Sequence, residues 1–370
     1  MEGVTDFATR LWFQMVGGMA FTWTPFMRVT DSFPAKLPEA FAPELTTLKG
    51  MFPADLILQV MGSRPEDVVR TADVLGDKIA FIDLNCGCPS PTVVSSRAGS
   101  SLLEQADIFG DFLEFVSRRV GPGRLSVKMR TGFHDAKEFP ALLSAIKHLP
   151  LRHLTVHGRT RPGRYLGEAD WSLIQYAQDT MSCPVIGSGD ICDKESLAVR
   201  SLTAAGVNRV IIGRGALRNP WIFSGKTAAP VLMAVIAFIV MQDTAFHSPE
   251  MLTRWAAERG GGSFGLETED EWRRDIESLL RICGVSVSDV GSVEVSARAL
   301  SRGKMLWNYL RSSLPEVFME PLLMRRTKLS DFAAGIREIS QSAGLSVGQL
   351  PLRHRPELNW MYSGQGRGVK

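Results

Sequence analysis

Short apolar runs rich in β-branched residues recur along the first 212 residues, and this repeat constrains the fold more than any other feature. A weak run near 19–23 is followed by Leu56–Val60, Ile79–Leu84, Leu125–Met129, His153–His157, Pro184–Ile186 and Arg209–Ile212. From Leu56 onward most runs start about 23 to 31 residues apart, the length of one strand and one helix. The repeat predicts parallel strands with crossover helices. Seven strands are predicted, one short of a closed eight-stranded barrel.

Polar or glycine-rich residues follow each run. In a (β/α)8 barrel such loops converge on one face, where active sites lie. An open doubly wound sheet would also align its strand ends along one edge, so the loops alone leave both folds open. No G-x-G-x-x-G follows the first strand, which disfavours the dinucleotide-binding form of that sheet. The fold class predicted is α/β, a TIM-type (β/α)8 barrel with its first strand truncated, followed by a C-terminal helical domain.

The character of the sequence changes after residue 225, so the barrel is assigned to 1–225. Residues 226–267 are expected to be an insertion or linker, with one apolar run, Val231–Met241, of 11 residues that is too short to cross a bilayer. A helical domain is predicted over 268–345, because apolar residues recur there at helical spacing. Residues 346–370 are expected to form a mobile tail.

Charge is distributed unevenly between these regions. The whole chain carries a net charge of +3, but residues 297–356 contain 10 Lys or Arg against 4 Asp or Glu, which gives +6. A basic helical domain favours a phosphate-rich partner. A solvated helical surface explains the charge equally well, so charge alone leaves the partner open.

The broad class is that of a cytoplasmic protein without a membrane segment. The start, Met1-Glu2-Gly3, has no basic region of a secretory signal. Five cysteines without a repeated spacing are typical of a reducing compartment. No bound metal is expected, and a monomer is sufficient for the chemistry considered below.

The densest chemical signal is the segment Asp83-Leu84-Asn85-Cys86-Gly87-Cys88-Pro89. A cysteine in a loop after a barrel strand can be a nucleophile, a metal ligand or a proton donor. Two cysteines one residue apart, without a second Cys or His pair nearby, make a poor zinc site. No neighbouring base is evident to activate a nucleophile. Acid catalysis by a thiol is therefore favoured, and the spacing does not decide which cysteine acts.

Other strand ends suggest a flat phosphorylated cofactor. Gly187–Asp190 and Gly213–Gly215 end the last two strands, where barrels often bind phosphate, and Arg214 could add a charge-assisted bond. At Lys128 and His157 a cation could face the electron-rich edge of a reduced flavin. Gln59 offers a donor and an acceptor to a ring edge. Together these residues favour FMN.

The chain resembles the tRNA-dihydrouridine synthase family over nearly its whole length. The resemblance rests on Asp83–Pro89 and on several further segments: Met1–Asp6, Arg97–Ser100 with Leu102-Leu103, Val127–Gly132, Thr155–Thr160, Ala169–Trp171 and Gly213–Ala216. The segment Lys304–Arg311 is most similar to the dihydrouridine synthase C branch.

The resemblance implies that NADPH reduces FMN and that the flavin passes hydride to C6 of a uracil in tRNA, at position 16 on the branch likeness. Cys88 matches the general acid that protonates C5. The flavin positions are matched by Met1, Gln59, Lys128, His157, Ser188, Gly189, Asp190, Gly213 and Arg214. Asn85 and Arg130 match positions beside the uracil, and Lys304 and Arg311 are expected to contact the tRNA. The target base must leave its stack to reach the flavin, and a basic domain would bind the RNA backbone.

Two departures from the family pattern stand out. The family has a complete strand and Ala-Pro before the residue that matches Met1, so the first strand and one flavin contact are expected to be missing. Ser188 stands where the family has Asn, which should weaken a phosphate-side contact. Two rival functions remain: an FMN barrel acting on a small pyrimidine, like dihydroorotate dehydrogenase, and an RNA-binding relative without catalysis.

Overall fold

The computed structural model describes residues 5–17, 19–32, 43–45, 55–193, 206–259, 269–285, 293–319 and 321–352. Met1 and all but the first residues of the expected tail, 346–370, lie outside these ranges. The predicted flavin contact of Met1 therefore stays a prediction.

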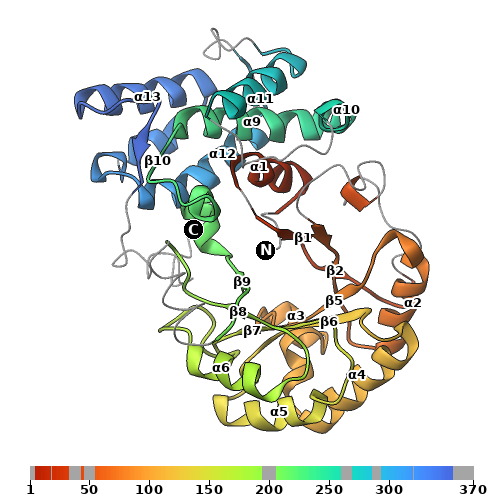
Figure 1. Ribbon diagram of the computed structural model, residues 1–370. Coiled ribbons are helices and arrows are strands. Elements are labelled where there is room, and N and C mark those ends of the chain that lie inside the picture. Colours follow the sequence, from red (N-terminus) through yellow and green to blue (C-terminus); the bar gives the residue numbers. More distant parts are fainter. Residues whose placement is uncertain are drawn as a thin grey trace.

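A curved sheet of seven parallel strands forms the first half of the molecule (Figure 1). Its strands are β2 (Met27–Arg28), β4 (Gln59–Met61), β5 (Ile82–Cys86), β6 (Leu125–Arg130), β7 (Leu154–His157), β8 (Val185–Ser188) and β9 (Val210–Ile211). They pair in chain order, whereas a doubly wound sheet reverses its order at a switch point. This order confirms the predicted barrel topology with seven strands. Among the described residues no strand joins β9 to β2.

The first two sheet positions are each interrupted by a short break. β1 (Phe21–Trp23) pairs with β3 (Asp55–Ile57) and directly precedes β2, while β3 directly precedes β4. The amide of Thr24 donates to the carbonyl of Ile57 at 3.0 Å, which continues the pairing across the break.

Helices cover the outer face of the sheet (Figure 1). They are α2 (Pro65–Leu75), α4 (Ala106–Val120), α5 (Phe139–Ile146) and α6 (Trp171–Thr180), with the short α3 (Pro91–Ser95) between β5 and α4. In α4 the buried residues Phe109, Phe112, Leu113 and Val116 recur at helical spacing and face the strands. Gly121, with φ +95°, ends the helix in a conformation that favours glycine.

The second half of the molecule is a layer of helices. It contains α9 (Val231–His247), α10 (Pro249–Arg259), α11 (Glu269–Ile282), α12 (Ala297–Leu310) and α13 (Leu329–Ser342). A short antiparallel pair, β10 (Ala228–Ala229) with β11 (Leu350–Pro351), ties the start of this layer to its end. The 3-10 helices within the described residues are η1 (Pro43–Leu45), η2 (Gly76–Lys78), η3 (Gly99–Leu103), η4 (Ala136–Glu138), η6 (Pro220–Phe223), η8 (Arg311–Ser313), η9 (Glu316–Met319) and η10 (Pro321–Arg325).

Helix α9 lies at the centre of this layer. It packs against α1 (Phe7–Gly17), α10, α11, α12 and α13, and its residues 234–241 are buried on all sides, whereas Phe246 near its end is exposed. Residues 226–267, expected to be an insertion or linker, thus include a core helix of the helical layer. Within the described ranges no single helix has the length and apolarity to cross a membrane. Helices α9 and α10 meet that test only as a pair bent by 119°.

Helix α1 (Phe7–Gly17) and the short α8 (Arg214–Arg218) connect the sheet to the helical layer (Figure 1). Trp12 of α1 is fully buried and donates its indole N–H to the carbonyl of Ala234 in α9 at 2.8 Å. Asp6, just before α1, pairs with Arg302 of α12 at 2.9 Å. On the other side, α8 packs against α12. The helical layer is therefore attached next to the end of β9.

The close approach of α9 and α12 leads to a prediction about stability. A Cβ on Gly303 of α12 would lie 2.2 Å from Cγ1 of Ile239 in α9. Alanine in a helix interior is normally favoured over glycine by about 1 kcal/mol, but overpacking costs about 1–3 kcal/mol. We expect Gly303→Ala to lower the free energy of unfolding, as measured by urea denaturation. In the Ile239→Ala/Gly303→Ala variant the two losses should be less than additive; simple additivity would contradict the contact.

Candidate active site

The register of the parallel strands brings the predicted site residues to one end of the sheet. Asn85 of β5 pairs with Lys128 of β6, and Arg130 of β6 pairs with His157 of β7. His157 pairs in turn with Ser188 of β8. Because all these strands run in the same direction, their carboxyl ends meet on the face where barrel enzymes carry their sites.

The loop that carries Cys88 is held by three side chains. Oδ1 of Asn85 accepts hydrogen bonds from the amides of Gly87 and Cys88, each at 3.0 Å. The hydroxyl of Ser100 donates to the carbonyl of Cys88 at 2.8 Å. Nε of Arg130 donates to the carbonyl of Gly87 at 2.8 Å. The loop backbone is thus fixed on both sides of the Cys88 thiol.

The loop that carries Cys88 also packs against η3. Gly99, with φ +61°, lies so close that a Cβ there would be 3.2 Å from Cβ of Cys88 and 2.7 Å from Val93. Glycine is required at this position for both reasons. The sequence pattern Arg97–Ser100 is therefore explained by its contact with the Cys88 loop.

The structure distinguishes the two cysteines of the motif. Cys86 is fully buried in β5, and burial raises the pKa of its thiol far above the usual range, with a smaller contribution from Asp83. Cys88 lies beyond the strand and is partly exposed. Only Cys88 can present its sulfur to a reactant at this end of the sheet.

A chain of buried polar side chains lies beneath the loop. Nε2 of Gln59 donates to Asp83 Oδ2 at 2.7 Å, and Nδ2 of Asn85 donates to Gln59 Oε1 at 2.7 Å. The hydroxyl of Ser126 donates to Asp83 Oδ1 at 2.6 Å. Gln59 and Asn85, expected at the cofactor and the base, are therefore linked to each other. Sequence reasoning gave no role to Asp83 or Ser126.

Lys128 lies beside Asn85 and has no hydrogen bond or ion pair within the described segments. Burial and, to a smaller extent, the charge of Arg130 lower the pKa of its ammonium to about 8. The negative charges of Asp83 and of an ionised Cys88 oppose this shift. A buried ammonium without a partner is costly, and it is suited to meet an electron-rich group of a ligand.

His157 differs from Lys128 in its charge. Burial lowers the pKa of its imidazole well below the ordinary value, and the positive charges of Lys128, Arg130, Arg159 and Arg214 add to the effect. The ring is therefore neutral at neutral pH and can donate or accept a hydrogen bond. Of the two cations expected from the sequence, only Lys128 carries charge.

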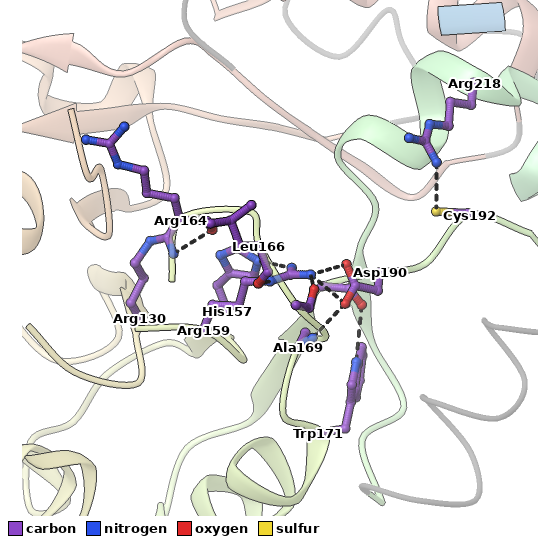
Figure 2. A network of polar contacts seen from close by, with 12 residues as sticks. Arg130, His157, Arg159, Arg164, Leu166, Ala169, Trp171, Asp190, Cys192 and Arg218 are labelled. Carbon is purple, nitrogen blue, oxygen red and sulfur yellow. Dashed lines mark hydrogen bonds and ion pairs between the residues drawn. The ribbon is translucent and has the colours of Figure 1, made fainter. Parts of the chain in front are cut away.

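Asp190 connects the loops after β7 and β8 (Figure 2). Its carboxylate accepts two contacts from Nη2 of Arg159, at 2.6 and 2.7 Å, and one from the amide of Ala169 at 2.6 Å. The carbonyl of Gly189 accepts the indole N–H of Trp171 at 3.1 Å. The side chain of Asp190 is thus engaged with the protein, so only the backbone of residues 188–190 is left for a phosphate.

Gly213 and Arg214 lie where β9 turns into α8. A Cβ on Gly213 would meet no heavy atom within 4 Å, so this backbone is open to the approach of a ligand. The guanidinium of Arg214 lies 4.4 Å from the ring centre of Tyr165, and that of Arg130 lies 5.8 Å from the same ring. Sequence reasoning missed Tyr165. Its position among arginines, Arg161 to Tyr165, was the available signal.

The predicted substrate residues have different surroundings. The guanidinium of Arg130 is almost completely buried, and its Nη1 donates to the carbonyls of Thr160 and Arg164 at 2.8 and 3.0 Å. Arg311 donates to the carbonyl of Met319 and to Asn308, so it is bonded within the helical layer. Lys304 is partly exposed on α12. Among the described residues no group of three or more His, Cys, Asp or Glu could hold a metal ion.

Comparison with known proteins identifies the family. Residues 1–235 match the family described as dihydrouridine synthase. The chain belongs to this family.

Three curated proteins show how much of this chain is similar to known dihydrouridine synthases. The chain is 33% identical over 227 residues to a tRNA-dihydrouridine(16) synthase of Shigella flexneri. The aligned region covers 60% of this chain and 71% of that protein. It is 35% identical over 173 residues to tRNA-dihydrouridine synthase B of Xanthomonas campestris, covering 46% and 52%. It is 35% identical over 188 residues to a tRNA-dihydrouridine(47) synthase of Coprinopsis cinerea, covering 45% of this chain and about a quarter, 27%, of that protein.

The different burial of the two motif cysteines predicts their reactivity. With limiting iodoacetamide at pH 8, the native protein should be alkylated at Cys88 and should remain unmodified at Cys86, because alkylation requires an accessible thiolate. Peptide mass spectrometry measures both positions, and the denatured protein, alkylated at both, is the control. Equal modification of Cys86 in the native state would contradict the described site.

Proposed function

We propose that this dihydrouridine synthase family member reduces a uridine of tRNA to 5,6-dihydrouridine, with FMN as cofactor and NADPH as reductant. The observation that carries the proposal is the fixed Cys88 loop next to Asn85 and Lys128 at the carboxyl end of a parallel barrel, where the Lys128 ammonium has no hydrogen bond or ion pair to any described residue. Relatives named for dihydrouridine formation in tRNA support it.

The residues at this end suit an isoalloxazine ring with a phosphate tail. Lys128 offers an ammonium that makes no hydrogen bond or ion pair in the part of the chain that the structure describes, and neutral His157 offers a hydrogen bond. The backbone at 188–190 and the open Gly213, with Arg214 next to it, would hold the phosphate. Gln59 would contact the ring edge, since each polar atom of its amide can make a second hydrogen bond.

Cys88 supplies the acid. A bound FMN supplies hydride, taken from NADPH, to C6 of the uracil. The Sγ–H of Cys88 then gives its proton to C5, so the C5=C6 double bond becomes two C–H bonds and the sulfur is left as a thiolate. Lys128 stabilises negative charge near this thiolate, and solvent returns the proton. Asn85 fixes the backbone of the loop and so holds the sulfur of Cys88 where it would face the base.

The helical layer would bind the tRNA backbone. Within its basic segment, residues 297–319 and 321–352, five basic side chains are exposed: Arg298, Arg325, Arg326, Lys328 and Arg337. Contacts of this kind neutralise phosphates and weaken with salt. Lys304 is partly exposed on α12 and adds to this set, whereas the bonds of Arg311 within the layer favour a structural role. Position 16 is the proposed target, in line with the name of the Shigella relative.

Replacing the proposed acid tests the chemistry. Cys88→Ala should retain FMN, because the thiol does not hold the cofactor, and should slow dihydrouridine formation by about 100-fold or more, since acid catalysis contributes 10²–10⁴. Mass spectrometry of tRNA nucleosides under single-turnover conditions measures the rate. Cys283→Ala, at the end of α11, is the matched control. An unchanged rate in Cys88→Ala would remove this residue from the mechanism.

The lowered pKa of Lys128 predicts a pH-dependent affinity for FMN. An electron-rich ring beside the ammonium raises its pKa on binding, so the charged form is the one that binds. Affinity is then complete below pH 8 and is lost as the pH rises through 8, by about 10-fold at pH 9. Flavin fluorescence titrations of the apoprotein measure this. In Lys128→Met the affinity should be lower and nearly constant between pH 7 and 9; an unchanged slope there would assign the titration to another group.

A further inference from the structure

The buried polar chain beneath the Cys88 loop ends on two groups of fixed character. At one end both oxygens of Asp83 accept hydrogen bonds, from Gln59 and from Ser126. At the other end the amides of Gly87 and Cys88 can only donate. Between these ends lie two carboxamides, Gln59 and Asn85, each of which can be turned by 180° to exchange its donor and acceptor.

The two ends together permit one orientation of both amides. Because the carboxylate of Asp83 accepts only, Gln59 must turn its Nε2 toward it and its Oε1 toward Asn85. Asn85 must then turn its Nδ2 toward Gln59 and its Oδ1 toward the loop. That is the orientation in which Oδ1 can accept hydrogen bonds from the amides of Gly87 and Cys88, and all four hydrogen bonds are between 2.7 and 3.0 Å long.

We infer that Asp83 is a positioning residue for the Cys88 thiol, acting through the donor and acceptor order of Gln59 and Asn85. The inference rests on the proposed function for its catalytic meaning, but the physical linkage does not. Asp83 is fully buried and lies two residues before Asn85 in β5. A buried carboxylate is expensive unless it is fully hydrogen-bonded, and here it specifies a single state of the network that holds the reactive loop.

Substitutions at the acceptor end should loosen the loop. In Asp83→Asn the end group can donate or accept, so the order is held only by the loop amides, and the reversed order, which gives up both hydrogen bonds from Gly87 and Cys88 to Asn85, is opposed at one end instead of two. Asn85→Ala removes the acceptor of the loop amides altogether, so it should loosen the Cys88 loop most. Ser126→Ala removes the other bond to Asp83 but leaves the order unchanged, and it is the matched control.

The readout is alkylation of Cys88 by iodoacetamide over pH 6 to 10, resolved by peptide mass spectrometry. Removing a buried charge moves the midpoint of the profile directly, whereas a looser loop raises the plateau rate, so the plateau is compared. We expect a plateau about 3- to 10-fold above that of the unmodified protein for Asp83→Asn, a larger rise for Asn85→Ala, and a change under about 2-fold for Ser126→Ala. Cys86 must stay unmodified, which excludes global unfolding.

A double variant restores the order of donors and acceptors by moving the carboxylate from position 83 to position 59. In Asp83→Asn/Gln59→Glu the carboxylate at position 59 accepts from Asn85 and from the new amide at position 83, whose oxygen still accepts from Ser126. The plateau should return to within about 2-fold of the unmodified protein. A plateau of Asp83→Asn equal to that of Ser126→Ala, or no recovery in the double variant while Cys86 stays protected, would overturn the inference.

The alkylation test needs neither flavin nor tRNA, so it decides the linkage even if no dihydrouridine is formed. Where the proposed function holds, Asp83→Asn should also lower the single-turnover rate of uridine reduction, and the double variant should recover part of it. A chain without this activity that still shows the alkylation pattern would contradict the proposed function alone.

Discussion

The parallel hydrogen bonding of β5 to β6 and of β6 to β7 sets the positions of the polar side chains at the carboxyl end of the barrel strands. The register places Asn85 beside Lys128 and Arg130 beside His157. A shift by one residue would turn these side chains into the layer between strands and helices and would bring apolar ones inward. The buried apolar face of the strands therefore fixes the register, and the register in turn fixes the chemistry.

Charge is arranged in layers along the barrel axis. The Asp83 carboxylate lies deepest, with hydrogen bonds to Gln59 and Ser126. Lys128, two residues further toward the carboxyl end of the strands, has no hydrogen bond or ion pair to the described residues. Burial, together with the charges of Lys128 and the neighbouring arginines, lowers the pKa of His157 and keeps it neutral. The charged ammonium of Lys128 is thus available to a ligand, while the carboxylates of Asp83 and Asp190 are hydrogen-bonded within the protein.

The helical layer is built on the barrel rather than appended to it. α1 packs against α9, and α12 packs against α8, which follows the last described strand. Trp12 and Asp6 each bond across this boundary. A tRNA held on the exposed basic residues of the layer would therefore have a fixed position relative to the strand ends.

The sequence by itself determined the strands, their parallel order and the loops that carry chemistry. Each strand of a parallel barrel is a short buried run, and each run ends in polar residues that need no tertiary context to be noticed. The sequence also indicated Cys88, Lys128 and the glycine loops. It did not reveal Asp83, Arg159 or Tyr165, whose roles depend on partners such as Gln59, Asp190 and Arg214, 24 to 49 positions away. Only the tertiary structure decided that α9 is a core helix. Its apolar run indicates that the helix is buried, but it does not indicate which helices pack against it. The charge of His157 was also decided there, since burial and four surrounding cations set it.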